Sequence, residues 1–182
     1  MKLVLTSFIV FILMVSSAIA QGPKAADAQA NVATEKSSAP IEREKFDPAK
    51  DPAVDLARAV EQATAENKRI ILDIGGEWCV WCRYMDRFIL LNPSLSELKK
   101  KNFIWVKVNM SEENENKAFL SAYPAAAGYP HLFVLDEKGS LLKSQDTSLL
   151  ENDKVYDLGK FTEFLKTWGP PEKKPEKKVE GK

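Results

Sequence analysis

The two cysteines of the chain, Cys79 and Cys82, constrain its fold and chemistry more than any other feature. The apolar run 69–74 before them predicts a buried strand, and the residues that follow, through Leu91, predict a helix. Cys79 should therefore stand at a helix N-terminus, where backbone N–H groups and the helix dipole stabilise an anion. A thiol in that position is more acidic than a free one, and a second thiol one turn later can attack a mixed disulfide. The pattern favours dithiol–disulfide exchange.

Other interpretations of the cysteine pair are an inert core thiol and a permanent structural disulfide, although so short a loop gains little chain entropy from a bridge. A zinc site usually needs four Cys or His ligands, and the chain has two cysteines and one histidine, His131. A c-type haem signature needs histidine at position 83, where Arg83 stands. We expect no metal and no cofactor. The formal net charge is zero, so no global field indicates nucleic acid.

The N-terminal segment predicts export. Residues 1–20 read as a signal peptide, with Lys2 before an apolar run and an Ala-x-Ala pattern that predicts cleavage after Ala20. The alternative is an uncleaved membrane anchor, for which the apolar run is short. A periplasmic or secreted location follows, where disulfides persist. Residues 21–50, rich in Ala, Lys, Ser and Glu, predict a disordered linker.

Residues 51–169 predict one folded domain. Asp51 and Pro52 suit the start of a helix that runs to about Glu66. A polar insertion spans 145–157, and residues 170–182 read as a disordered charged tail. Together the elements predict a mixed sheet with helices on both faces. The predicted strands are 69–74, 103–109, 131–135 and 140–144, and the later helices are 79–91, 94–101, 113–123 and 159–168.

This domain resembles the thioredoxin-like family. The motif 77–82 after an apolar strand carries most of the match, supported by Asp73 six residues before Cys79, Lys107 in the second strand, and Tyr129-Pro130 before the third. The resemblance is nearest to periplasmic thioredoxin-fold proteins and to the C-terminal domain of the DsbD reductant carrier. It implies an α/β thioredoxin fold and a thiol–disulfide oxidoreductase. Val-Trp stands between the cysteines, where thioredoxin has Gly-Pro.

The resemblance and the chemistry together assign the catalytic roles. Cys79 is the expected nucleophile, and Cys82 is the expected resolving thiol, which should be less exposed. Asp73 is interpreted as the base that takes the proton of Cys82, since burial raises a carboxyl pKa toward the useful range. The alternative is a half-exposed strand acid paired with Lys107.

Four further residues are candidates for substrate binding. A cis bond before Pro130 would leave the backbone of Tyr129 free to pair with an extended substrate, whereas a trans bond would make Pro130 an ordinary loop residue. Trp78 and Trp81 would form an apolar platform beside Cys79, although Trp78 suits core packing equally well. His131 is interpreted as a hydrogen-bonded strand residue rather than as a titrating group of the site.

The direction of exchange depends on how strongly the protein stabilises the reduced thiolate. Val80 and Trp81 donate no hydrogen bond to a Cys79 sulfur, so a reducing pair is expected. The prediction is a monomeric reductase of disulfide-bonded protein substrates, recharged by a membrane electron-donor protein. The alternatives are a disulfide oxidase or isomerase, and a non-catalytic chaperone or maturation factor that binds a client.

Overall fold

A computed structural model describes residues 43–171 of the chain. The predicted signal peptide, most of the predicted linker and the tail from residue 172 lie outside this part. Among the described residues, no helix has both the length and the apolar character needed to cross a membrane.

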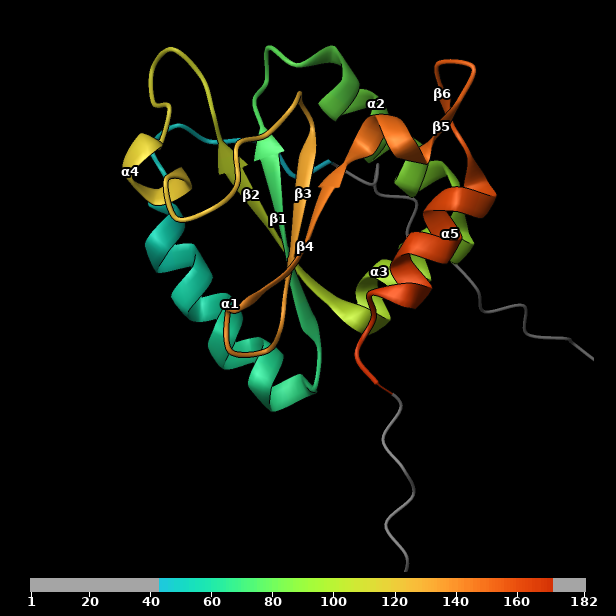
Figure 1. Ribbon diagram of the computed structural model, residues 1–182, viewed down its shortest axis with the longest axis horizontal. Helices are drawn as coiled ribbons and strands as arrows, with labels where there is room; N and C mark the ends of the chain where they lie inside the picture. Colours follow the sequence, from blue (N-terminus) through green and yellow to red (C-terminus); the bar gives the residue numbers. More distant parts are fainter. Residues whose placement is uncertain (1–42, 172–182) are drawn as a thin grey trace, which may run out of the picture. The chain divides into compact units, whose positions relative to one another are not determined.

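The described residues form a four-stranded mixed sheet in the order β2-β1-β3-β4 (Figure 1). The central strand β1 runs parallel to β2 and antiparallel to β3, which in turn pairs antiparallel with β4. The strands are β1 (Arg69–Gly75), β2 (Phe103–Asn109), β3 (His131–Leu135) and β4 (Leu141–Asp146). The thioredoxin fold predicted from the sequence is therefore confirmed.

Helices cover both faces of this sheet because the side chains of β1 alternate between two apolar cores. Ile70, Leu72 and Ile74 pack toward α1 (Pro52–Glu66). Ile71 belongs to the opposite core, with residues of α2 (Val80–Leu91), α3 (Pro93–Asn102) and α5 (Leu158–Thr167). Figure 1 shows α1 and the short α4 (Lys117–Leu120) on one side of the sheet, and α2, α3 and α5 on the other. The side chain of Asp73, between Leu72 and Ile74, lies on the face of the sheet that α2 covers.

The helix expected over 113–123 is shorter in the structure, where α4 covers only Lys117–Leu120. Ser111 and Asn114 exchange backbone hydrogen bonds in a turn, and Asn116 adopts a positive φ of 48°. Asn and Asp favour such turns through bonds to the local backbone, so they outcompete the helix that the apolar spacing suggested.

The segment 145–157 is more structured than the polar insertion that we expected. Strand β4 continues to Asp146, a 3-10 helix η1 covers Thr147–Leu150, and a hairpin pairs β5 (Glu151–Asn152) with β6 (Val155–Tyr156). Tyr156 is only 4% exposed, and its ring centroid lies 5.5 Å from that of Tyr84 on α2. One aromatic residue in a polar stretch thus fastens the hairpin against the cysteine-bearing helix.

The predicted disordered linker is wrong for its last eight residues. Residues 43–50, which we call the strap, pack on the domain, and Phe46 is only 3% exposed. The backbone N–H of Phe46 donates a 2.9 Å hydrogen bond to Glu77, and Arg43 forms ion pairs with Glu77 and Asp86. Average composition hid these contacts because one aromatic ring and one guanidinium group provide them.

Candidate active site around the cysteine pair

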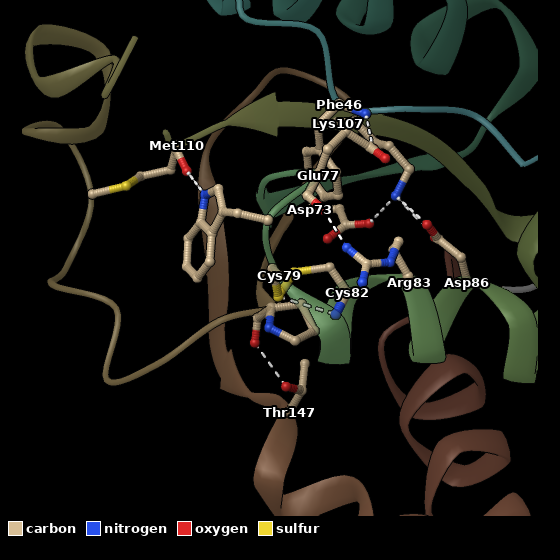
Figure 2. The surroundings of a disulfide bond; sticks show 12 residues. Phe46, Asp73, Glu77, Cys79, Cys82, Arg83, Asp86, Lys107, Met110 and Thr147 are labelled. Atoms are coloured by element: carbon tan, nitrogen blue, oxygen red, sulfur yellow. Dashed lines mark hydrogen bonds and ion pairs between the residues drawn. A yellow bond between two sulfur atoms is a disulfide. The ribbon is translucent and has the colours of Figure 1, made fainter. Parts of the chain in front are cut away.

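Cys79 and Cys82 form a disulfide at the start of α2, in a cluster that includes Phe46 (Figure 2). Cys79 is the N-cap residue of the helix, and the backbone N–H of Cys82 donates a 3.0 Å hydrogen bond to its Sγ atom. Cys79 is 4% exposed, whereas Cys82 is fully buried. Cys79 is thus the more exposed of the two cysteines, in the order expected from the sequence.

Gly75, the last residue of β1, allows this close packing. A Cβ atom at this position would lie 2.5 Å from the Sγ atom of Cys82 and 3.0 Å from the ring of Phe46. Because Sγ is held by the disulfide and the ring is buried, neither neighbour can easily move away. The strand therefore needs glycine here for spatial reasons.

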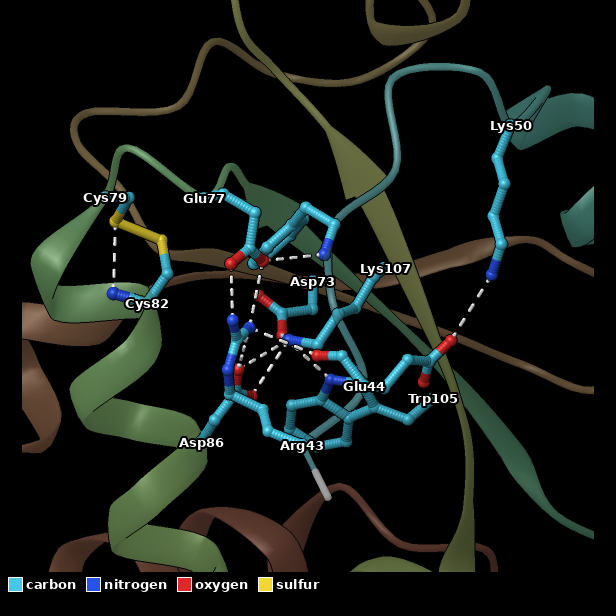
Figure 3. Close-up of polar contacts among 11 residues, drawn as sticks. Arg43, Glu44, Lys50, Asp73, Glu77, Cys79, Cys82, Asp86, Trp105 and Lys107 are labelled. Carbon is cyan, nitrogen blue, oxygen red and sulfur yellow. Dashed lines mark hydrogen bonds and ion pairs between the residues drawn. A yellow bond between two sulfur atoms is a disulfide. The ribbon is translucent and has the colours of Figure 1, made fainter.

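Asp73 lies between the cysteine pair and Lys107, as Figures 2 and 3 show. Asp73 and Lys107 are paired residues in the register of β1 and β2, and Lys107 Nζ donates a 2.9 Å hydrogen bond to Asp73 Oδ2. Trp105 Nε1 donates to the same oxygen at 3.0 Å. The other oxygen, Oδ1, is buried without a hydrogen-bond partner. The half-exposed alternative for Asp73 is wrong, because the residue is fully buried, but its pairing with Lys107 is present.

Asp86 is a site residue that the sequence analysis missed. Its two carboxylate oxygens accept hydrogen bonds from Lys107 Nζ at 2.8 and 3.1 Å. Burial raises its pKa above the ordinary value; the positive charge of Lys107 opposes this shift and the charge of Asp73 adds to it. An acid four residues after Cys82 on the same helix face was the available signal.

Lys107 thus joins two buried carboxylates. Burial acts to lower its pKa, but the attraction of Asp73 and Asp86 outweighs burial, and the pKa lies above the ordinary lysine value. The lysine therefore stays charged, and its charge is held beside the disulfide.

Arg43 and Glu77 complete the polar network on the strap side (Figure 3). Arg43 Nη1 donates hydrogen bonds to Glu77 Oε1 at 3.0 Å and to Asp86 Oδ2 at 3.2 Å. Its hydrogen bond lowers the pKa of Glu77, against a smaller opposing effect of burial. This guanidinium group therefore links the strap to Glu77 and to Asp86 of α2.

Trp78 and Tyr129 form the outer side of the site. Trp78 is 56% exposed, its indole N–H donates a 2.7 Å hydrogen bond to the carbonyl of Met110, and its ring meets Tyr129 edge-on. Tyr129 packs against the cluster that holds both cysteines. The Tyr129–Pro130 peptide bond is cis, and the buried Pro130 accepts a 2.7 Å hydrogen bond from Thr147 at its carbonyl. The alternative interpretation of Trp78 as a core residue is wrong, because the residue is too exposed.

Trp81 extends this apolar outer surface along the first turn of α2. Its ring is exposed on one side and meets Tyr84 and Tyr156 edge-on at centroid distances of 5.5 and 5.9 Å. His131 is buried beyond Pro130, and its Nε2 atom shares a 2.8 Å hydrogen bond with Ser144. That arrangement fits the hydrogen-bonded strand residue expected from the sequence.

Comparison with known proteins gives one family and several more distant similarities. Residues 51–137 match the model of a thioredoxin-like family. Spermatogenesis-associated protein 20 from Mus musculus is 32% identical over 76 residues, which make up 40% of this chain and 10% of that protein. The chain thus spans about a tenth of the length of the curated relatives it matches.

Among solved structures, a disulphide isomerase from Xylella fastidiosa Temecula1 superposes with a TM-score of 0.58 at 22% identity, covering 67% of this chain and 94% of that one. The oxidised C-terminal domain of DsbD from Neisseria meningitidis gives a TM-score of 0.48 at 22% identity, covering 69% and 99% of the two chains. At such identities the first likeness shows the fold alone, and the second is too distant to carry an inference.

Proposed function

We propose that the protein is a thioredoxin-like thiol–disulfide oxidoreductase that reduces disulfide bonds of other proteins outside the cytoplasm. The hydrogen bond from the Cys82 N–H to Cys79 Sγ, at the start of α2, carries the proposal that this pair exchanges disulfides. An N–H donor and the positive end of a helix stabilise a thiolate on Cys79, which makes it the attacking sulfur.

In the first step, the thiolate of Cys79 attacks one sulfur of the substrate disulfide. The substrate S–S bond breaks as the new one forms, and the second substrate sulfur leaves as a thiolate that takes a proton from water. The exposed rings of Trp78 and Trp81 would bind apolar parts of the substrate around the attacked bond. The backbone of Tyr129 would pair with an extended substrate segment.

In the second step, Cys82 resolves the mixed disulfide. Its thiol transfers a proton to Asp73, and the resulting thiolate attacks Cys79 Sγ, which releases the substrate's other sulfur as a thiolate. The unpaired Oδ1 oxygen of Asp73 supports this role, because it is buried and free to accept a proton while Oδ2 is held by Lys107 and Trp105. The products are a reduced substrate and the Cys79–Cys82 disulfide.

A surface cavity of about 530 Å³ lies on the inner side of the site. Its lining includes Asp86, Trp105 and Lys107 but neither cysteine. The cavity would give solvent access to Trp105 and Lys107, which hold Oδ2 of Asp73, while the substrate still covers Cys79.

The next cycle needs two electrons from a partner protein. A dithiol donor would attack Cys79, the more exposed sulfur of the disulfide, and would finish with its own two cysteines oxidised. We propose a membrane-held electron donor, in agreement with the signal peptide predicted for residues 1–20 and the periplasmic location it implies. The sequence Val80-Trp81 supports the reducing direction. Val80 is exposed, and Trp81 packs on two tyrosines rather than donating to Cys79.

Equilibration with glutathione buffers tests the direction of the reaction. The purified protein should have a reduction potential below roughly −200 mV and should catalyse insulin reduction, since Val80 and Trp81 add no further donor to the Cys79 thiolate. Cys79→Ser should abolish that catalysis. A potential near about −120 mV, typical of the strongest oxidants of this chemistry, would instead favour an oxidase. Activity that survives Cys79→Ser would favour a client-binding chaperone.

A further inference from the structure

The strap reaches the redox centre through Arg43, whose side chain is mostly buried. Its guanidinium group bridges Glu77, two residues before Cys79, and Asp86, four residues after Cys82. A planar fork that holds two carboxylates fixes both in position more firmly than a single charge would. Arg43 therefore connects the loop before the cysteines to the helix after them.

Phe46 is the second contact of the strap. Its ring lies against the cysteine cluster and would be 3.0 Å from a Cβ atom at Gly75. Lys107 Nζ lies 4.2 Å from the centroid of the same ring and forms a favourable cation–π interaction with it. The ring thus forms part of the wall that separates Cys82 and the Lys107 ammonium group from solvent.

The charges around the disulfide give Arg43 an electrostatic role. The network holds three carboxylates, of Asp73, Glu77 and Asp86, and two cations, of Lys107 and Arg43. Without Arg43, three carboxylates and one cation would surround sulfurs that must become negative during the reaction. Thiolate formation would then be less favourable, because like charges disfavour each other in a partly buried site.

We propose that the strap is a working part of the redox centre, an inference that rests on the proposed function. Arg43 acts as a positioning residue that holds Glu77 and Asp86 and favours the thiolate. Phe46 shields Cys82, so that attack from outside is directed to Cys79. The segment that looks like a linker in the sequence thus sets both the acidity and the selectivity of the two thiols.

The pH dependence of alkylation tests the role of Arg43. In the reduced full-length chain, the rate of Cys79 modification by iodoacetamide should follow its thiolate fraction. Arg43→Gln, which keeps a hydrogen-bond donor but loses the charge, should move the midpoint to higher pH by about one unit or less, from the loss of one nearby cation. Arg43→Lys, which keeps the positive charge, should bring the midpoint most of the way back to the wild-type value. Lys50→Ala is the matched control, because it removes the same charge from an exposed strap residue paired only with Glu44.

Peptide mapping after alkylation tests the role of Phe46. In the wild-type protein, Cys79 should react and Cys82 should remain protected. Phe46→Ala should expose Cys82 and accelerate its modification by about tenfold or more, since protection by a buried wall is lost. Phe46→Leu, which keeps an apolar cover, should give an intermediate rate. Circular dichroism would establish that each variant is folded.

Two outcomes would overturn the inference. One is a wild-type alkylation midpoint in folded Arg43→Gln, and the other is a protected Cys82 in folded Phe46→Ala. If Phe46→Ala does not fold, the intermediate rate predicted for Phe46→Leu tests the same shielding of Cys82. Failure of the proposed function looks different: the wild-type chain would not reduce insulin, while the midpoint shift and the exposure of Cys82 would still be observed.

Discussion

The two sides of the disulfide differ in almost every physical property. On the outer side, Trp78, Val80 and Trp81 present exposed apolar surface next to Cys79. On the inner side, Asp73 and Lys107 are buried charges next to Cys82 (Figure 3). Apolar surface binds without strict geometry, whereas buried charges act strongly and only when correctly placed. Substitutions on the inner side should therefore change stability and proton transfer, and those on the outer side should change substrate binding.

Removing Lys107 should give the largest effect. Lys107→Met leaves the buried carboxylates of Asp73 and Asp86 without the cation between them, and breaking a buried ion pair from one side costs roughly 3–5 kcal/mol. Urea unfolding at pH 7 measures the loss, with the exposed Lys101→Met as control. Lys107→Met combined with Asp73→Asn should recover part of it. A loss equal to that of the control would show that the inner network contributes nothing to stability.

The loss in Lys107→Met should also depend on pH. The pKa of Asp86 is already raised by burial, and it should rise further without Lys107. A group with a raised folded-state pKa binds its proton more tightly in the native state, so its stabilising contribution is complete at low pH and is lost as pH rises through that pKa. The variant should therefore be closest to wild-type stability in acid and furthest from it near neutral pH.

Asp73→Asn should separate proton transfer from stability on the inner side. The amide keeps the shape of the carboxylate but cannot accept the Cys82 proton, so the second step should slow by roughly 100-fold at pH 7. Rapid-mixing measurements of substrate release from the mixed disulfide give this rate, which should recover as pH rises. Asp86→Asn, which removes a charge but keeps the Asp73 carboxylate, should cause a smaller loss. An unchanged release rate in Asp73→Asn would leave the residue a purely structural role.

Trp78→Ala should affect the outer side alone. Loss of an exposed ring from a substrate-binding surface should raise KM by about tenfold, or about 1.4 kcal/mol of binding, with kcat nearly unchanged. Insulin reduction over a range of substrate concentrations measures both constants. Leu91→Ala removes another exposed apolar side chain, at the far end of α2, and should change neither constant. If the two variants behave alike, the outer surface does not bind substrate.

His131→Gln should have the smallest effect and should appear only in stability. Burial lowers the pKa of His131 from its ordinary value of 6.5, with Asp146 opposing the shift. Its contribution to stability is therefore complete above about pH 6.5 and is lost as pH falls toward the folded-state value. His131→Gln should reduce that pH dependence, by no more than about 1 kcal/mol. A change in the pH profile of activity would mean that His131 takes part in the chemistry.

Sequence reasoning reached the fold and the chemical core because both follow local patterns. A continuous apolar run defines β1, and the Cys-x-x-Cys pair that follows this strand locates the start of α2. Asp73 and Lys107 could be matched through the resemblance to the thioredoxin-like family, and the register of β1 and β2 pairs them.

The missed residues depend on contacts between segments distant in sequence. Arg43 meets Asp86 across 43 positions, and Phe46 is the buried aromatic of a segment whose composition suggests disorder. Tyr156 lies in a polar hairpin whose position is set only once α2 is in place. A single anchoring residue changes average composition very little, so only tertiary structure could reveal it.

The different roles of the two sulfurs are tested most directly by trapping a mixed disulfide. Reduced Cys82→Ser and Cys79→Ser are each mixed with insulin, quenched in acid and separated without reductant for mass analysis. Cys82→Ser should accumulate a covalent adduct through Cys79, because attack proceeds and resolution does not. Cys79→Ser should form almost none. Equal adducts in both variants, or none in either, would contradict a mechanism in which Cys79 attacks and Cys82 resolves.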